Sequence, residues 1–347
     1  MPPHGPSCPA TVMPRLARRD FIGLAAASAA ALGLPAPALP LSAPERLVLY
    51  ISDRVNAALV RALGPTRFNV AILAFLYARY RGGVLHLTYN GVPARRLPAA
   101  LAPELRRLRL GFATPKRILI SIGGWGNRGT FEAIRAAGVE RFLDQLDAEF
   151  VGPLGLEGLD LDLEPSTVAE NTPAGWRAVH DDLGATLVAI TNGYMRRHPH
   201  HAVTHAPIAS VAAALYAGDG KLRGVRGSFF DAARIPRGNH IAWLNLQFYE
   251  AGDPKPVSIP DFYRNELVLP LLARRDSTGI ARPWEVLVPG FEPRYHQDRD
   301  FCEQTLRQIN HAIAPMGRAG GVFLWQYGQV AATVAAWSDG LARALSD

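Results

Sequence analysis

The chain has 347 residues, 48% of them hydrophobic, and a mean hydropathy of +0.03, which together predict a compact globular domain with a sizeable core. The net charge of +7 is spread over segments such as Arg95 and Arg96, which indicates solvated helix faces rather than a nucleic-acid-binding surface. The two cysteines, Cys8 and Cys302, exclude a disulfide framework or a cysteine-based zinc site once the N-terminus is removed.

The N-terminal segment has the composition of an export signal. Arg18 and Arg19, followed by an Asp-Phe-Ile run, resemble the twin-arginine motif of bacteria. A short alanine-rich run and an Ala-Pro-Ala segment follow, and a start at Met13 would give this signal a more usual length. We therefore expect residues 1–38 to be a cleaved signal peptide and the mature protein to be periplasmic or secreted. A membrane anchor is the alternative, but the apolar run is short and alanine-rich for a bilayer, so no stable membrane insertion is expected.

From residue 45 onward, apolar strands alternate with longer helical patterns, which is typical of βα units around a parallel sheet. The predicted strands lie at residues 47–51, 69–76, 117–122, 155–165, 202–207, 241–249, 285–290 and 321–325. The predicted helices lie at residues 55–63, 99–110, 130–150, 174–197, 260–274, 299–313 and 331–345. An alternating stretch at 80–90 predicts a small hairpin after the second strand. The pattern predicts an α/β fold, a single (β/α)8 TIM barrel over residues 45–347 without an inserted domain.

The fourth predicted strand, at residues 155–165, carries a row of acids. Side chains along a strand alternate between its faces, so Asp160, Asp162 and Glu164 share one face while three leucines share the other. Like charges at close range raise one another's pKa values, so packing alone gives little reason to stack three carboxylates. Catalysis does give a reason, because it needs carboxyl groups held in different protonation states.

Four motifs fall on the predicted strands in chain order. They are residues 121–124 (SIGG), 157–164 (EGLDLDLE), 247–249 (QFY) and 321–325 (GVFLW). Together they resemble motifs of glycoside hydrolase family 18, the chitinases and endo-β-N-acetylglucosaminidases, in the plant-type form of a single-domain barrel. Ala74 and Phe75 on the second strand fit the same pattern. One departure is Glu157, which stands where the family usually has Asp and makes the local geometry less certain without removing a catalytic group.

The resemblance implies a retaining glycosidase in which the acetamido group of the substrate is the nucleophile and forms an oxazolinium ion. Glu164 would be the general acid and then the base, with its pKa raised by Asp162. Asp162 would also orient the acetamide, and Tyr249 would donate its hydroxyl to the acetamide oxygen. Asp160 would tune Asp162 from below through a shared proton. The resemblance implies no cofactor and no metal.

The same resemblance implies a set of substrate-binding residues. Gln247 would contact the sugar, Gly124 would lie beside it, and Trp325, Phe75 and Tyr50 would form the apolar floor on which the pyranose stacks. Without the motifs, Trp325 and Phe75 would be interpreted as ordinary core and the Ser-Ile-Gly-Gly segment as a tight turn, whereas for Tyr50 core and floor are evenly balanced.

Three alternatives stay open at this stage. The acids could instead bind a hard metal ion, although three acids on one strand do not make a metal cage. The substrate could be chitin or chito-oligosaccharides, or an N-glycan, and the loops at 80–90 and 209–239 would decide between them. The barrel could also be a non-catalytic lectin. Inactive members of the family, however, typically lack the acidic residue at the position of Glu164. We expect a monomer, and we expect His205 to be a hydrogen-bonded interior histidine.

Overall fold

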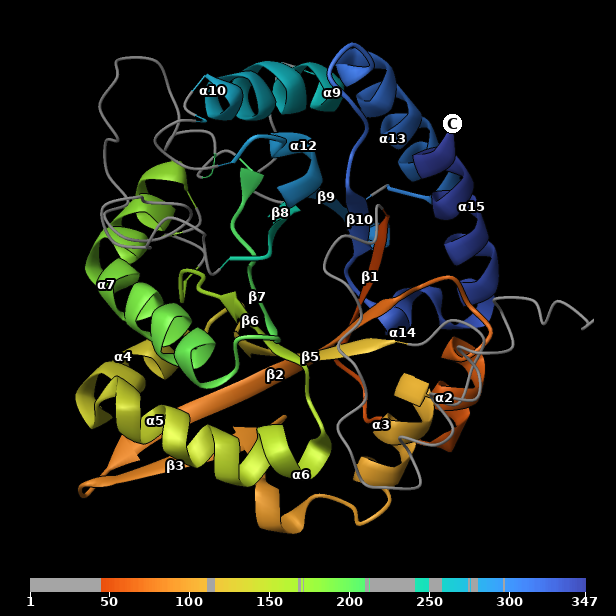
Figure 1. Ribbon diagram of the computed structural model, residues 1–347. Coiled ribbons are helices and arrows are strands. Elements are labelled where there is room, and N and C mark those ends of the chain that lie inside the picture. Colours follow the sequence, from red (N-terminus) through yellow and green to blue (C-terminus); the bar gives the residue numbers. More distant parts are fainter. Residues whose placement is uncertain are drawn as a thin grey trace, which may run out of the picture. The chain divides into compact units, whose positions relative to one another are not determined.

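The computed structural model describes residues 45–110, 116–167, 170, 172–209, 212, 241–249, 258–273, 275, 280–295 and 297–347 (Figure 1). The predicted signal peptide at 1–38 and most of the loop at 209–239 lie outside these ranges. Within them, no helix combines the length and the apolar character that crossing a membrane requires.

In the described residues, eight parallel strands close into a barrel (Figure 1). They are β1 (Arg46–Ile51), β2 (Val70–Arg81), β5 (Arg117–Gly123), β6 (Gly158–Asp162), β7 (Ala202–His205), β8 (Trp243–Gln247), β9 (Leu287–Phe291) and β10 (Gly321–Leu324). Each pairs with the next barrel strand, and β1 pairs with both β2 and β10, so the ring is closed. The predicted (β/α)8 barrel is confirmed, and every predicted strand is found with small shifts at its ends.

The hairpin after the second strand is an extension of that strand. β2 continues past its predicted end at residue 76 to Arg81, turns at Gly82 and Gly83, and pairs antiparallel with β3 (Val84–Tyr89). Both glycines have positive φ, 56° and 76°, which a tight hairpin turn needs and which glycine adopts without a steric penalty. A two-residue strand, β4 (Val92–Pro93), pairs with β3.

Five helices of the described ranges match the predicted ones. They are α2 (Ala57–Leu63), α3 (Leu101–Leu110), α7 (Pro173–Arg197), α13 (Arg299–Ile313) and α15 (Val334–Ser346), the last preceded by α14 (Tyr327–Val330) and η7 (Ala331–Thr333). The predicted single helix at 130–150 is wrong, because Gly138 interrupts it with a φ of 91°. Its place is taken by α4 (Arg128–Ala137), α5 (Val139–Leu146), the π-helical η2 (Asp147–Val151) and α6 (Gly152–Leu154).

The helical segment predicted at 260–274 is also subdivided. Ser258 caps α9 (Ile259–Phe262) by accepting the N–H of Asp261, and the chain continues as the π-helical η5 (Tyr263–Val268) and α10 (Leu269–Leu272). A further helical turn, α12 (Pro283–Val286), precedes β9 and shortens the predicted strand at its start.

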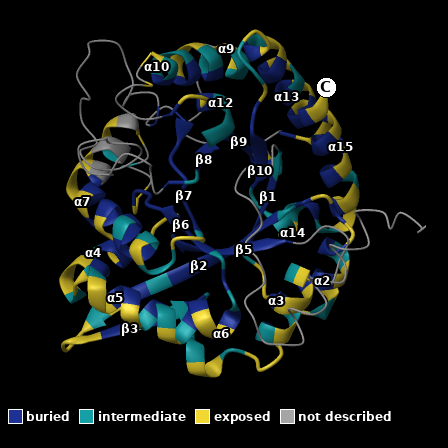
Figure 2. Cartoon of the chain, in the orientation of Figure 1, coloured by how far each residue is buried: buried dark blue, intermediate teal, exposed yellow. Residues whose placement is uncertain are grey.

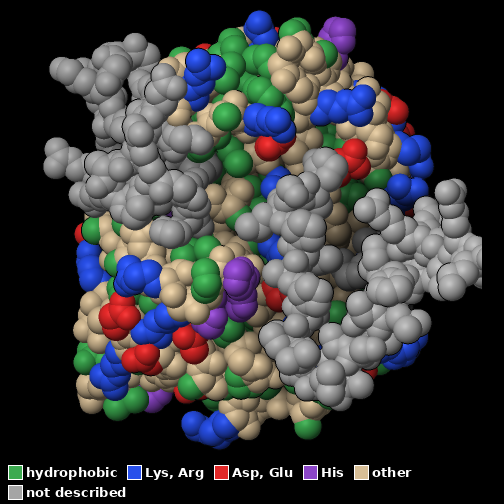
Figure 3. Space-filling model, viewed as in Figure 1, with side chains coloured by type: hydrophobic (Ala, Val, Ile, Leu, Met, Phe, Trp, Pro, Cys, Tyr) green, Lys and Arg blue, Asp and Glu red, His purple; other side chains and the backbone are tan. Residues whose placement is uncertain are grey.

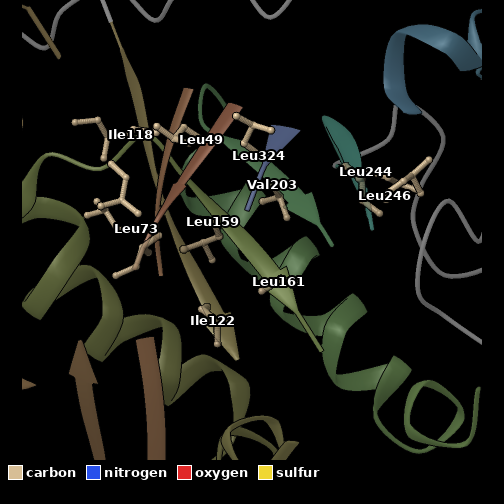
Figure 4. Close-up of a cluster of buried hydrophobic side chains, with 14 of the residues drawn as sticks. Leu49, Leu73, Ile118, Ile122, Leu159, Leu161, Val203, Leu244, Leu246 and Leu324 are labelled. Atoms are coloured by element: carbon tan, nitrogen blue, oxygen red, sulfur yellow. The ribbon is translucent and has the colours of Figure 1, made fainter. Parts of the chain in front are cut away.

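Two hydrophobic clusters cover the two faces of the barrel wall in the described residues. Outward-facing side chains such as Leu49, Leu159 and Leu161 pack with the surrounding helices (Figure 4). Inward-facing side chains, Ile72 and Trp243 among them, form a second and smaller cluster. Within the barrel the strands are almost entirely buried, while the helices and the β2–β3 hairpin have exposed positions (Figure 2). Because apolar side chains hold the outer face of β6, its inner face is free to carry polar ones.

The amino-terminal ends of the strands form the bottom of the barrel and carry buried and partly buried charges. The Lys116 ammonium donates to two backbone carbonyls, at 2.9 and 3.4 Å, and the Arg46 guanidinium lies 5.0 Å from the ring centroid of Trp243. Glu157, just before β6, lies 3.8 Å from the guanidinium of Arg109. Basic and acidic side chains also lie next to one another over the surface seen in Figure 3. Charge at this end is balanced by opposite charge, by carbonyls or by an aromatic ring.

Candidate active site

Asp160, on the inner face of β6, is fully buried in the barrel. Its carboxylate accepts hydrogen bonds from the hydroxyls of Tyr50 at 2.9 Å, Ser121 at 2.7 Å and Thr204 at 2.5 Å, and from the amide of Asn245 at 3.2 Å. Burial raises the pKa of Asp160, and the four hydrogen bonds oppose that rise because they favour the carboxylate. These neutral donors come from four different strands, so the network fixes Asp160 and the strands around it.

Tyr50, which we expected in a sugar-binding floor, is buried between Asp160 and Trp325. It is 1% exposed, its hydroxyl donates to Asp160, and its ring meets the ring of Trp325 edge-on at 5.4 Å between centroids. Burial and the nearby Asp160 raise the pKa of Tyr50 well above its ordinary value, so the hydroxyl stays protonated and remains a donor. Its contacts in the structure are thus with Asp160 and the Trp325 ring.

Asp162, one layer above Asp160, is also held in place. Its Oδ1 accepts a hydrogen bond from Nε2 of Gln247 at 3.2 Å, and the same Nε2 donates to the carbonyl of Ala206 at 2.9 Å. The backbone carbonyl of Asp162 accepts the N–H of Gly124 at 2.8 Å. Asp162 therefore has its backbone tied to the end of β5 and its side chain tied to β8.

The two glycines at the end of β5 are required by close approach. A Cβ on Gly123 would lie 2.3 Å from the carbonyl oxygen of Asp162, and one on Gly124 would lie 2.6 Å from the ring of Phe75. Both residues also have positive φ, 108° and 82°. The two glycines of the Ser-Ile-Gly-Gly segment thus let the end of β5 approach Phe75 and Asp162 closely. Ser121 of the same segment donates its hydroxyl to the Asp160 carboxylate.

Aromatic rings line the interior above this polar network. Phe75 and Trp325 stack with ring centroids 5.4 Å apart and an interplanar angle of 30°, and Tyr249 meets Phe323 edge-on at 6.3 Å. Among the described residues, the Ala74–Phe75 and Trp325–Gln326 peptide bonds are cis. Asn90 fixes the backbone at Phe75, because its side-chain oxygen accepts the Phe75 N–H at 2.9 Å and its own N–H donates to the Phe75 carbonyl at 3.0 Å.

These groups surround a cavity of about 120 Å³ at the carboxyl ends of the strands. It is lined by Phe75, Tyr77, Trp125, Asn127, Asp162, Glu164, Gln247, Tyr249, Glu292 and Trp325. Six of these residues are sequence-predicted site residues, and they come from β2, β6, β8 and β10 or from the residues just after those strands. Of the other predicted site residues, Asp160 and Tyr50 lie below the cavity and Gly124 lies behind Phe75.

Four lining residues were missed by the sequence analysis: Tyr77, Trp125, Asn127 and Glu292. Glu292 is 3% exposed, and its Oε1 accepts from Arg294 Nε at 3.1 Å and from Gln329 Nε2 at 2.8 Å. The signal for each was its place at or just after the end of a barrel strand, where the mouth of a TIM barrel lies.

Other sequence-based expectations concern residues around the cavity. His205 is completely buried, with Nε2 3.0 Å from the Thr191 hydroxyl, so the expected interior hydrogen-bonded histidine is confirmed. Over the residues that the structure describes, no group of three or more His, Cys, Asp or Glu side chains is arranged to hold a metal ion. Both oxygens of Asp160 are already occupied by hydroxyl and amide donors.

Comparison with known proteins identifies the fold. No protein-family profile and no curated protein sequence matches the chain. Solved structures do match. A fungal endo-β-N-acetylglucosaminidase from glycosyl hydrolase family 18 is 22% identical, with a TM-score of 0.54 over 86% of this chain and 98% of that chain. The barrel has the family 18 fold.

Two chitinases resemble the chain in the same way. ChiC from Aspergillus fumigatus is 21% identical, with a TM-score of 0.51 over 82% of this chain and 91% of that chain. The catalytic domain of a hyperthermophilic chitinase from Pyrococcus furiosus is 12% identical, with a TM-score of 0.51 over 87% and 96%. At these identities the likeness establishes the fold, and an argument about activity must come from the residues of the cavity.

Proposed function

We propose that the protein is a retaining glycosidase that hydrolyses β-1,4-linked N-acetylglucosamine, as chitin or chito-oligosaccharides, by substrate-assisted catalysis. One observation carries the proposal: Asp162, Glu164, Tyr249 and Trp325 line a single cavity at the mouth of the barrel. The first three can supply an anion, an acid and a hydroxyl donor, and the indole gives a face for a pyranose ring. This reaction needs those groups together around one sugar.

Glu164 is the proposed general acid and base. Its side chain lines the cavity, yet the residue is only 7% exposed, so it can meet a bound glycosidic oxygen away from bulk water. In the first step Glu164 gives its proton to the leaving oxygen while the acetamide oxygen attacks C1 and the glycosidic bond breaks. In the second step the carboxylate takes a proton from water, which attacks C1, opens the oxazolinium ring and restores the acid.

Asp162, Tyr249 and Gln247 are proposed to hold the acetamide. Asp162 would accept the acetamide N–H, and its negative charge would stabilise the positive oxazolinium ion. The Tyr249 hydroxyl would donate to the acetamide oxygen and turn it towards C1. The Gln247 amide already binds both Asp162 and the Ala206 carbonyl, and this keeps the Asp162 carboxylate oriented before substrate arrives.

An endo-β-N-acetylglucosaminidase acting on N-glycans is the second candidate, because a structure with that activity in its name shares the fold. Both reactions use the same chemistry at the same sugar, so the difference lies in what surrounds it. A non-catalytic lectin on this barrel is disfavoured by the presence of the acid, Glu164, in the cavity.

The test is a product analysis with chitohexaose and a high-mannose glycopeptide run side by side. Shorter chito-oligosaccharides with β-configured reducing ends are the expected products from the first substrate, because double displacement retains the anomeric configuration. Cleavage of the glycopeptide alone would favour the second candidate. No cleavage of either, with binding retained, would favour the lectin. A parallel reaction with excess chelator should proceed at the same rate. A loss of activity with chelator would support the alternative that the acids bind a metal ion.

We also propose that the protein is exported, with residues 1–38 as a twin-arginine signal. The adjacent Arg18 and Arg19, ahead of an apolar, alanine-rich run, support this. Cell fractionation of a variant with Arg18→Lys and Arg19→Lys tests the proposal. The variant should accumulate inside the cell at full length, and normal export of the variant would contradict this route.

A further inference from the structure

A second and larger groove adjoins the cavity. It has a volume of about 1130 Å³ and is lined mainly by the β2–β3 hairpin and α4. Tyr77 and Asn127 line both the groove and the catalytic cavity. The hairpin extends from the barrel beside α4 and α5 (Figure 1). A glycan chain that leaves the cavity past Tyr77 and Asn127 would therefore enter this groove.

The hairpin presents one consistent face to the groove. Along β2, Tyr77, Arg79 and Arg81 share that face because side chains alternate along a strand. On β3, Thr88 lies opposite Tyr77 and His86 lies opposite Arg79. Of these residues Arg79, Arg81 and His86 are exposed, while Leu85 and Leu87 on the other face of β3 are buried. The groove face of the hairpin is thus cationic, and the aromatic ring of Tyr77 lies at the end of this face that is nearer the cavity.

Among the residues that the structure describes, no acidic side chain balances the charge of Arg79 and Arg81. Neither Arg79 nor Arg81 forms an ion pair with any residue in the described part of the chain, unlike Arg128 and Arg135 on α4, which both pair with Asp182 at 2.9 Å. The acid on the opposite wall, Glu132, is engaged by Arg128 at 2.9 Å. Within the described ranges, the groove therefore offers two guanidinium groups that no ion pair occupies.

A third guanidinium lies at the tip of the hairpin. Arg141 on α5 donates to the carbonyl of Gly83 at 2.9 Å, and its guanidinium carbon lies 6.0 Å from the ring centroid of Tyr80. These contacts tie the turn of the hairpin to α5. The Arg79 and Arg81 side chains are consequently presented from a ribbon that is anchored at both ends.

We propose that this groove binds a carboxylate-bearing part of the glycan, so that the preferred substrate is an anionic polymer in which N-acetylglucosamine is accompanied by acidic sugars. Arginine suits this ligand because its planar guanidinium matches a carboxylate with two parallel hydrogen bonds. Tyr77, at the junction with the cavity, offers a ring face to the sugar between the reacting unit and the acidic one. This inference rests on the proposed function for the reacting sugar, and it adds the chemical class of the sugars beyond it.

The test compares chitohexaose with the same oligosaccharide oxidised to carboxylates at C6. Binding of both is measured by calorimetry on a Glu164→Gln background at about 20 mM and about 500 mM salt, because screening by salt separates charge from shape. The carboxylated ligand should bind more tightly at low salt, by about fivefold if two exposed ion pairs form, and this preference should fade at high salt. A salt-independent preference, or none, would overturn the proposal.

Two double variants sharpen the result. Replacing Arg79→Gln and Arg81→Gln together should bring the affinities of the two ligands to within about twofold of each other. Replacing Arg95→Gln and Arg96→Gln, two exposed arginines outside the groove, changes the net charge equally and should keep the preference. Equal effects of the two double variants would show that only overall charge matters and would contradict the groove. Cleavage of chitohexaose by the unmodified protein is scored separately, so failure of the groove and failure of the proposed activity give different results.

Discussion

The two ends of the barrel handle buried charge in different ways. At the bottom, Glu157 faces the guanidinium of Arg109, and Lys116 donates to backbone carbonyls. Towards the mouth, Asp160 lies below the cavity among neutral hydroxyl and amide donors, and Asp162 at the cavity accepts from the amide of Gln247. All three acids belong to one short segment around β6.

This difference in how charge is compensated suggests that the bottom of the barrel contributes to stability and the mouth to catalysis. The charge of a carboxylate that faces a cation is compensated within the protein. A carboxylate oriented by neutral donors has no such compensation, so its charge can stabilise a positive charge on a ligand. We therefore expect substitutions at the mouth to change turnover and substitutions at the bottom to change stability. The following predictions test this contrast, from the largest effect to the smallest.

Replacing Glu164→Gln should give the largest loss. The amide keeps the shape of the side chain but cannot transfer a proton, so kcat on chitohexaose should fall by about 10²–10⁴-fold while binding is kept. Steady-state kinetics and calorimetry measure the two quantities. The matched control is Glu157→Gln, the same exchange just before β6 at the bottom of the barrel, which should leave kcat unchanged. Full activity of the Glu164→Gln protein would refute the proposed mechanism.

Replacing Asp162→Asn should lower kcat by about 10²-fold, because the neutral amide no longer stabilises a positive oxazolinium ion. The side chain at this position also loses its ability to titrate, so the acidic limb of the pH–rate profile should move. A pH series of kcat/KM on the variant and the wild type measures both effects. An unchanged profile would argue against an ionised carboxylate at this position.

Replacing Gly124→Ala should damage both activity and stability. Its Cβ would lie 2.6 Å from the ring of Phe75, and φ at this position is 82°. The strain should lower the free energy of unfolding by about 1–3 kcal/mol, and displacement of the Phe75 ring should raise KM for the glycan. Gly129→Ala is the control, because a Cβ added at Gly129 would have no atom within 4 Å and its φ is not positive. Equal stability of the two variants would contradict the close approach.

Replacing Lys116→Met should change stability alone. Burial lowers the pKa of Lys116 from 10.5 to about 8, so between these pH values the unfolded chain binds more protons than the folded one. Wild-type stability should therefore rise as the pH rises from about 8 to about 10.5, by on the order of 2 kcal/mol relative to the variant. Denaturant titrations across that range measure the difference, and kcat at neutral pH should be unaffected. A parallel pH dependence in the two proteins would disprove the role of Lys116.

Much of this architecture could be predicted from the sequence. Apolar segments that alternate with helical patterns located all eight strands, and a period of two put the acids of β6 on the inner face. The helix predicted at 130–150 was wrong at Gly138, because apolar periodicity continues through a residue whose positive φ breaks the helix. The end of β2 was placed too early because the continuous apolar run stops at Leu76, whereas the strand itself continues to Arg81 in the hairpin.

The sequence by itself determined which side chains face the interior of the barrel, because the face of a strand residue follows from local geometry alone. Only the tertiary structure decided how high each one lies in that interior, because height depends on how eight strands are staggered against one another. Stagger brings the Tyr50 hydroxyl to Asp160 and keeps Tyr50 out of the cavity lining, and it brings Glu292 to the wall of the cavity. It also joins Tyr77 and Asn127, which are far apart in the chain, at the junction between the cavity and the cationic groove.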